Sequence, residues 1–348
     1  MANLVDRIIL CDIATTAASG IDLTDTEIAA KAEAGALGLL VKGSTQVQGI
    51  TTDSSGNIYL ADSATHAVYK VAEGGVISTV AGDAGTSGRN GTLTNLNNQA
   101  ARFNAPAYCA CDKSGAVYIS DTGNNQIRVI RGGKVSHFAG NGDGVAGYVD
   151  GTALACRFDS PGGLCVDNDG AVYVADTGNN CIRKITGNTV ITIAGRNATA
   201  DNENIRASSS TACFNAPRDI AMMPNGNLVV LDSGNYKIKV IDKKGWLYLL
   251  SGAGTAGQTL GTAGNQQYTC TYRDLYCCDI DKTGNIYVAE CNGGSYKDRL
   301  IKVAPDGTPS NINIVETTAT ANVGSLIGVA VNKSQKLLVI FSDVRDPR

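Results

Sequence analysis

The residue types that most often build metal and catalytic sites are scarce in this sequence. Histidine occurs only as His66 and His137, and the single tryptophan is Trp246. No two cysteines have the C-x-x-C spacing of a zinc site, and neither histidine lies near a cysteine pair. We therefore expect the cysteines to be small buried hydrophobic residues, and we predict no metal and no cofactor.

Charge and long apolar runs are also in short supply. Charged residues make up 18% of the chain and the net charge is −3, so the sequence lacks the basic stripe that binding to nucleic-acid phosphates requires. No apolar run is long enough to cross a bilayer, and the run at Ile8–Leu10 is too short for a signal peptide. We expect a protein made in a cytosol, without membrane insertion and without a nucleic-acid partner.

What the sequence does contain is one recurring hairpin. Its clearest copy is Ala171–Ile185, AVYVADTGNNCIRKI, in which two alternating segments flank a Thr-Gly-Asn-Asn turn. Related copies begin at Asn57, Ala116, Asn227 and Asn285. Before most copies stands a turn such as Asp167–Gly170, where the Asp can bond its own downstream backbone and the Gly can take a positive φ.

Each hairpin is the centre of a larger unit. An apolar strand such as Gly163–Asp167 precedes it and a strand such as Val190–Gly195 follows it. Four antiparallel strands per unit are typical of a propeller blade. The loops between units close on an aromatic residue and a proline, and we interpret the aromatic residues as plugs between blades: Phe103, Phe158 and Phe214.

The two ends of the chain are expected to complete each other. A sixth, degenerate copy stops after two strands, Leu326–Asn332 and Leu337–Phe341, and leaves a bare edge. Two N-terminal segments, Arg7–Ile13 and Leu37–Lys42, can supply its outer half. A capping box at Thr24 predicts a short helix over residues 25–34 between them.

The predicted fold class is therefore all-β. We expect a six-bladed β-propeller of four-stranded antiparallel blades, closed by N-terminal strands that complete the last blade, with one short N-terminal helix. Residues 1–348 form a single domain, in which residues 1–46 hold the closing strands and the helix and residues 47–341 hold the repeats.

The repeat resembles that of the NHL family of β-propellers, in its bacterial or phage style. The resemblance rests on the hairpin pattern, on the Ala-Gly that ends the fourth strand and on the Phe-x-x-Pro before the next blade. It covers about residues 47–341 and weakens at both ends, since Ala64-Thr65 replaces Gly-Asn in the first copy and Glu290 replaces the Asp in the fifth. It implies a propeller used for docking, for RNA binding or, in related six-bladed rings, for hydrolase or lyase chemistry at a channel metal.

A carboxylate recurs at the first position of the hairpin turn in every copy. Because a feature present in every blade is more typical of a scaffold than of a site, we interpret these residues as structural, accepting N–H bonds from the turn that follows. Arg128, Arg183, Lys239 and Lys302 recur on the third strand, and we take them as candidates to reach a neighbouring turn carboxylate. The structural turn carboxylates are Asp62, Asp121, Asp176, Asp232 and Glu290.

The functional prediction depends on residues that differ from the repeat. No nucleophile, base or carboxylate pair stands out in this way, and neither histidine is placed to point into the channel. We therefore predict no catalytic residues and a non-enzymatic module. The polar, glycine-rich loops without an export signal predict a bacteriophage virion protein, made in the host cytoplasm, structural or adhesive in role. Its partners are expected to be other subunits of a larger assembly and a cell-surface ligand. The alternative is a cytoplasmic bacterial propeller that acts as a docking scaffold or as a metal-dependent lyase or hydrolase.

Overall fold

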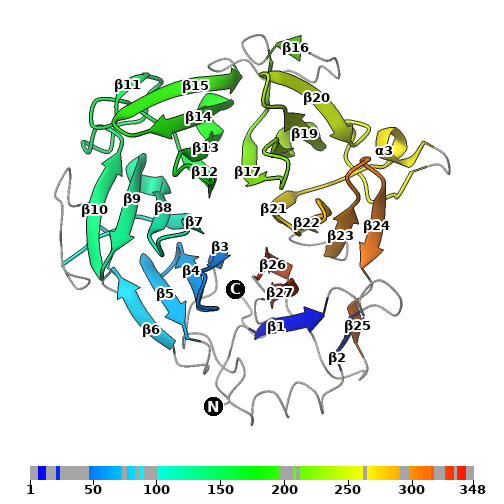
Figure 1. Ribbon diagram of the computed structural model, residues 1–348, viewed down its shortest axis with the longest axis horizontal. Coiled ribbons are helices and arrows are strands. Elements are labelled where there is room, and N and C mark those ends of the chain that lie inside the picture. Colours follow the sequence, from blue (N-terminus) through cyan, green and yellow to red (C-terminus); the bar gives the residue numbers. More distant parts are fainter. Residues whose placement is uncertain are drawn as a thin grey trace.

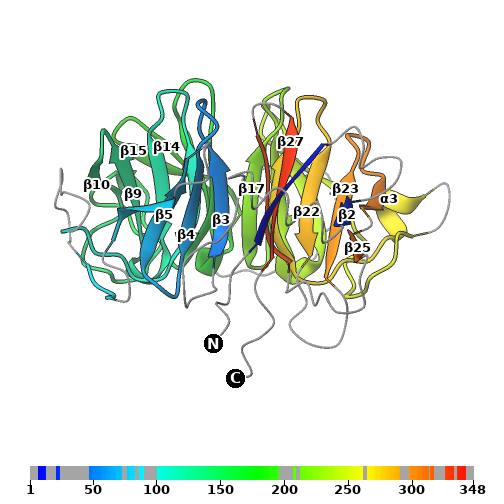
Figure 2. The same ribbon diagram turned by 90° about the horizontal axis from the view of Figure 1, so that it is seen from below.

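The computed structural model arranges small antiparallel sheets around a central axis (Figure 1). It describes residues 7–12, 21–23, 47–72, 77–82, 86–89, 100–195, 207–208, 212–261, 265–290, 298–312, 314–316, 326–332 and 335–341. Figure 2 shows the sheets standing edge-on beside one another around the ring.

Five of the sheets are complete blades. Their strands follow one another in the sequence from the innermost to the outer strand. Blade 1 consists of β3 (Val47–Thr52), β4 (Ile58–Asp62), β5 (Ala67–Val71) and β6 (Ile77–Ala81). Blade 2 consists of β7 (Pro106–Cys111), β8 (Val117–Asp121), β9 (Gln126–Arg131) and β10 (Lys134–Ala139). Blade 3 consists of β12 (Pro161–Val166), β13 (Val172–Asp176), β14 (Cys181–Thr186) and β15 (Thr189–Gly195), with β11 (Gly151–Thr152) at its outer edge.

The remaining two complete blades follow the same plan. Blade 4 consists of β17 (Pro217–Met222), β18 (Leu228–Asp232), β19 (Lys237–Ile241) and β20 (Trp246–Ser251), with β16 (Ala207–Ser208) at its outer edge. Blade 5 consists of β21 (Leu275–Ile280), β22 (Ile286–Glu290), β23 (Arg299–Val303) and β24 (Pro309–Ile312). A four-residue helix, α3 (Gln266–Thr269), lies in the loop before blade 5.

The expectation of six four-stranded blades is wrong. Between blades 5 and 1 the described residues form a three-stranded sheet, in which β27 (Lys336–Phe341) lies between β26 (Leu326–Val331) and β1 (Arg7–Asp12). A single N-terminal strand pairs there, so no complete closing blade results. The other short segment, β2 (Ile21–Leu23), pairs in parallel with β25 (Ile314–Glu316) and forms a separate two-stranded sheet. The helix expected over 25–34 and the strand expected at Leu37–Lys42 lie outside the described residues.

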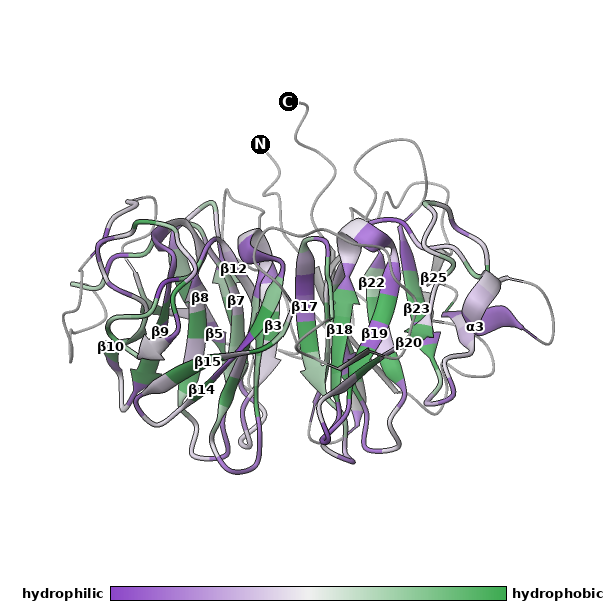
Figure 3. Ribbon diagram, turned by 90° about the horizontal axis from the view of Figure 1, so that it is seen from above, coloured by the Kyte–Doolittle hydropathy of each residue, from purple (hydrophilic) through white to green (hydrophobic). Residues whose placement is uncertain are grey.

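The strands form where the sequence alternates and turn where it becomes polar. Gly170 has a φ of +84°, and its N–H bonds Asp167 O at 3.2 Å. Oδ1 of Asp167 accepts the backbone N–H groups of Asp169 and Ala171 at 3.0 and 2.8 Å, as expected for this turn. Figure 3 shows that apolar residues follow the strands and that polar residues gather in the loops.

The core lies between the blades. Phe158 is fully buried and packs with Tyr118 of blade 2 and Val172 of blade 3. Phe103 and Phe214 are likewise fully buried, each in a cluster shared by two successive blades. Because these rings fill the space between sheets, they hold the innermost strands at a fixed distance around the channel.

Candidate functional site

Each turn carboxylate is the last residue of the second strand of its blade. Asp176 is fully buried, and its Oδ2 accepts hydrogen bonds from Arg183 Nη1 at 2.7 Å and from Asn179 Nδ2 at 2.9 Å. Its Oδ1 accepts the backbone N–H of Asp159, which follows the plug Phe158, at 2.8 Å. The carboxylate thus ties its hairpin to the loop that enters the blade.

The same arrangement recurs with differences. Oδ1 of Asp121 and of Asp232 accepts the N–H of Asn104 and of Asn215, at 2.8 and 2.7 Å. These three carboxylates therefore bond the backbone of the preceding loop and, in the turn that follows, the side-chain amide of its asparagine, whereas the sequence led us to expect bonds to the backbone of that turn. Asp62 follows the expected pattern. Its Oδ1 accepts the backbone N–H groups of Ala64 and Thr65, which belong to the turn that follows, at 2.9 and 3.2 Å.

Glu290 replaces the Asp in blade 5 and uses its longer side chain differently. It accepts the backbone N–H of Arg273, the Nε of Arg299, and Gln258 Nε2 at 3.1 Å. Of the third-strand cations, Arg183 and Lys239 reach the turn carboxylate of their own blade, each at 2.7 Å. Arg128 makes no such ion pair in the described residues.

The two histidines serve the scaffold. His66 lies in the hairpin turn of blade 1 at φ +56°, and its Nδ1 accepts the N–H of Ala105 at 2.9 Å. Asn125 and Asn180 occupy the same place in the next two blades and accept the N–H of Ser160 and of Ala216. His137 lies on the outer strand of blade 2 and is buried there. Neither histidine lines the channel.

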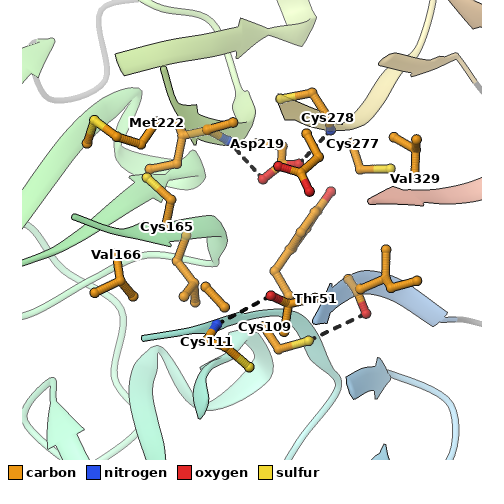
Figure 4. A pocket seen from close by; sticks show the side chains of 18 residues that line it. Thr51, Cys109, Cys111, Cys165, Val166, Asp219, Met222, Cys277, Cys278 and Val329 are labelled. Atoms are coloured by element: carbon orange, nitrogen blue, oxygen red, sulfur yellow. Dashed lines mark hydrogen bonds between the residues drawn. The ribbon is translucent and has the colours of Figure 1, made fainter. Parts of the chain in front are cut away.

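A cavity of about 210 Å³ lies at the channel. The innermost strands β3, β7, β12, β17, β21 and β26 all contribute to its wall. Among the lining residues that the structure describes, the only charged side chains are Asp219 of β17 and Asp279 of β21. Figure 4 shows Asp219 facing this space beside Cys277 and Cys278. Sequence reasoning missed both aspartates, although each stands out as a charged residue in a short apolar strand, DIAM and YCCDI.

Each aspartate also joins two neighbouring sheets. Oδ1 of Asp219 accepts the backbone N–H of the next residue, Ile220, and Oδ2 accepts the backbone N–H of Cys278 in blade 5. Asp279 repeats the pattern with Ile280 and with Val331 of β26. Thr51 of blade 1 makes the equivalent contact by accepting the N–H of Cys111 at 3.3 Å. These contacts place the carboxyl groups rigidly at the channel wall.

The two carboxyl groups have different pKa values, both raised by burial. The pKa of Asp219 is raised to about 8, chiefly by burial and also by the nearby Asp279, while the two accepted N–H bonds and the charge of Arg218 act against this. Burial likewise raises the pKa of Asp279 to about 6. At neutral pH, Asp219 therefore carries its proton and Asp279 is mostly ionised.

The position of Asp219 in blade 4 depends on a glycine of the preceding blade. Gly163 of β12 lies so close that a Cβ there would overlap Asp219 Oδ1 and its Cα. A hydroxyl on the protonated carboxyl has no acceptor among the hydrogen bonds that Asp219 makes in the described residues.

One end of the cavity is closed by side chains. Tyr108 of β7 reaches across the channel, and its hydroxyl donates to Tyr276 O of β21 at 2.8 Å. The guanidinium of Arg218 stacks on the Tyr276 ring at 3.9 Å from its centre. The lining residues continue from Tyr108 to Cys111 along β7, so the cavity extends toward the carboxyl-terminal ends of the innermost strands.

The cysteines at the cavity are free thiols: Cys109, Cys111, Cys165, Cys277 and Cys278. Burial raises the pKa of Cys111 to about 12 and raises the pKa values of Cys165 and Cys278 well above the usual value. A protonated thiol is a weak nucleophile and a poor metal ligand. The expectation that the cysteines act as small buried groups therefore agrees with their environment.

The channel residues do not fit the metal that the family resemblance implies. In the part of the chain that the structure describes, no group of three or more histidine, cysteine, aspartate or glutamate side chains is arranged to hold an ion. The described lining residues offer only two carboxylates and no histidine, and burial keeps the thiols protonated. In the same described part, no helix has the length and apolar character to span a membrane.

Comparison with known protein families and relatives supports the repeat. The family model described as NHL repeat matches residues 158–185 and 214–241. Human NHL repeat-containing protein 2 is 30% identical over 143 residues, which are 38% of this chain and 19% of that protein. Teneurin-3 of mouse is 28% identical over 219 residues, 56% of this chain and 8% of that protein. The chain thus spans a fifth or less of these two relatives.

Solved structures share the fold at low identity. A gluconolactonase of Xanthomonas campestris, XC5397, has a TM-score of 0.54 at 13% identity and covers 86% of each chain. Virginiamycin B lyase of Staphylococcus aureus has a TM-score of 0.51 at 12% identity, covering 85% of this chain and 77% of that one. A nidogen/laminin complex has a TM-score of 0.52 at 11% identity, with 88% and 91% covered.

These likenesses contradict the expectation of a non-enzymatic chain. That expectation rested on the lack of a nucleophile, base or carboxylate pair that stands out from the repeat and on the placement of the two histidines, and two of the structures with this fold are enzymes. At such identity the likeness shows the fold alone. None of the proteins named here is a virion protein, so the phage assignment gains no support.

Proposed function

Because this chain belongs to the NHL-repeat β-propeller family, we propose that it is a propeller enzyme that acts on a small molecule in the channel cavity. The reaction class is proton transfer of the kind used by lyases and hydrolases. The observation that carries the proposal is the placement of Asp219 and Asp279, on neighbouring blades, as the only charged side chains among the described residues that line the cavity.

The two carboxyl groups have the properties of an acid and a base. Asp219, with its pKa raised to about 8 by burial, holds a proton at neutral pH and can donate it to a leaving group. Asp279, with its pKa raised to about 6, is mostly ionised and can accept a proton. Two carboxyl groups whose environments separate their pKa values are a recurring acid and base assignment in enzymes.

No step of this proposal uses a metal, because the channel residues do not fit one. This distinguishes it from the metal-dependent lyase or hydrolase that the sequence resemblance implies. The virion location, the partner subunits and the cell-surface ligand expected from the sequence remain predictions.

The substrates named by the two enzymes of this fold provide the first assay. Purified protein is tested for hydrolysis of gluconolactone and for lyase cleavage of virginiamycin B, with and without a chelator. We expect turnover that persists with chelator and that falls by about 10²-fold or more in Asp219→Asn. Thr51→Val is the matched control, since it removes the equivalent contact between blades without touching a carboxyl group.

The outcomes separate an acid and base pair from a structural role. If Asp219→Asn and Thr51→Val lose activity equally, the aspartates act only by joining the blades and the proposal is wrong. The proposal is also wrong if turnover of these substrates disappears with chelator and returns with a divalent metal.

A further inference from the structure

A buried polar cluster in blade 2 contains several atoms without a hydrogen-bond partner. It comprises Gln126 and Arg128 of β9 and His137 of β10, which are 0%, 0% and 5% exposed. In the described residues, hydrogen bonds are lacking for Nη1 and Nη2 of Arg128, for both ring nitrogens of His137 and for Oε1 of Gln126. Buried polar atoms in folded proteins nearly always have a partner, so this cluster requires an explanation.

The strand register brings the three side chains together. Arg128 and His137 are paired across β9 and β10, and Gln126 precedes Arg128 by two residues on the same face of β9. Burial and the positive charge of Arg128 lower the pKa of His137 to about 4, against an opposing contribution from the backbone of Ala139 and Gly140. His137 is therefore neutral, and its ring still offers one N–H donor.

The neighbouring blades show what the guanidinium lacks. In blade 3, Arg183 Nη1 bonds Asp176 Oδ2 and Nη2 bonds Asp150 Oδ1, both at 2.7 Å. In blade 4, Lys239 Nζ bonds Asp232 Oδ2 at 2.7 Å. Every equivalent cation in these blades has a carboxylate oxygen in direct contact.

Gln126 accounts for the difference in blade 2. Its Nε2 donates to Asp121 Oδ2 at 2.7 Å, at the oxygen that receives the cation in blades 3 and 4. Cys181 takes this place in blade 3, where the cation reaches the carboxylate. Arg128 is left with one hydrogen bond, from Nε to Ser136 O at 3.3 Å.

We propose that Arg128 and His137 form a binding site for a small anion, a halide or a simple carboxylate, in blade 2. The anion takes the place that the Asp150 carboxylate has beside Arg183. It accepts hydrogen bonds from Nη1 and Nη2 of Arg128 and from the imidazole N–H of His137. Such binding compensates a buried charge that otherwise carries a large desolvation cost.

The test is the dependence of thermal unfolding on anion concentration. The wild-type protein, Arg128→Met and Gln126→Cys are each titrated with sodium formate and, separately, with sodium chloride. A ligand that binds only the folded protein raises its melting temperature with the logarithm of concentration, here by roughly 2 °C or more for each tenfold increase above the dissociation constant. General salt effects are common to all three proteins and cancel in the comparison.

We expect the additional rise in the wild type alone. Arg128→Met removes the donors, and Gln126→Cys copies blade 3, so that Arg128 is free to pair with Asp121 without an anion. If Arg128→Met does not fold, Gln126→Cys still decides the question. Equal responses in the wild type and Gln126→Cys overturn the proposal. This site is independent of the channel, so the result does not depend on the proposed function.

Discussion

Arg183 Nη1 lies 2.7 Å from Asp176 Oδ2, and both side chains are fully inaccessible to solvent. The pair connects two strands of blade 3, while the other oxygen of Asp176 holds the loop that carries Phe158. The carboxylate at the start of the hairpin turn therefore joins three parts of the blade: the hairpin, the loop that leads into the blade and the cation on the third strand.

Removing one member of this pair should be severe. Asp176→Ala leaves Arg183 buried with its remaining carboxylate, Asp150, at the surface, and breaking a buried pair typically costs about 3–5 kcal/mol. Chemical denaturation should show this loss in the free energy of unfolding. Asp143→Ala, which breaks the exposed pair between Asp143 and Arg157, is the control and should change stability little. A similar loss in both variants would contradict the scaffold role of Asp176.

The plug between blades 2 and 3 gives a second prediction. Phe158→Ala should lower the free energy of unfolding by about 3–5 kcal/mol, because the ring is fully buried and its removal leaves a cavity. Tyr148 lies against the same guanidinium of Arg183 but is 37% exposed, so Tyr148→Ala should cost clearly less. Comparable losses would show that contact with Arg183 matters more than burial between the blades.

The raised pKa of Asp219 predicts a pH dependence of stability. Between its ordinary value of 3.8 and its folded value of about 8, the unfolded chain has lost this proton and the folded chain keeps it. The folded state then binds more protons, so rising pH should destabilise the wild type relative to Asp219→Asn by about 1.4 kcal/mol per pH unit. The difference should level off above about pH 8.

Asp279→Asn provides the internal comparison for that measurement. Its difference from the wild type should level off near pH 6, since burial raises the pKa of Asp279 only to about 6. Unfolding curves recorded across this pH range would give both profiles. Parallel curves for the wild type and Asp219→Asn would mean that Asp219 ionises normally in the folded protein.

Gly163 should be essential for the position of Asp219. Gly163→Ala places a Cβ against Asp219 Oδ1 and its Cα, so the carboxyl group or strand β17 must move. We expect lost stability together with loss of the pH profile attributed to Asp219. Gly170→Ala has no atom within 4 Å of the new Cβ, and the strain of its φ of +84° should cost only about 1 kcal/mol and leave that profile intact. An unchanged profile in Gly163→Ala would show that the close approach is accommodated.

The repeat could be predicted from the sequence because its signals lie in residues close to one another. The alternation in Ala171–Ile185 and the turn at Asp167–Gly170 depend on residues next to one another, and they predict strands and turns correctly. The number of complete blades could not be predicted from such local signals. It depends on which segments pair with β27, and in the described residues only β1 does so on its outer side, so one sheet has three strands.

The two sites required the tertiary structure. Asp219 and Asp279 are 60 residues apart in the sequence, and only the ring places both in one cavity whose burial shifts their pKa values. Arg128 and Arg183 look equivalent in the aligned repeats, yet the Gln126 amide occupies the acceptor that Arg128 would use. The sequence by itself determined the blade, because hydrogen bonding and alternation act over a few residues. The tertiary structure alone decided which carboxyl groups face the channel and which cation is left unpaired, because burial and charge compensation depend on neighbours that folding brings together.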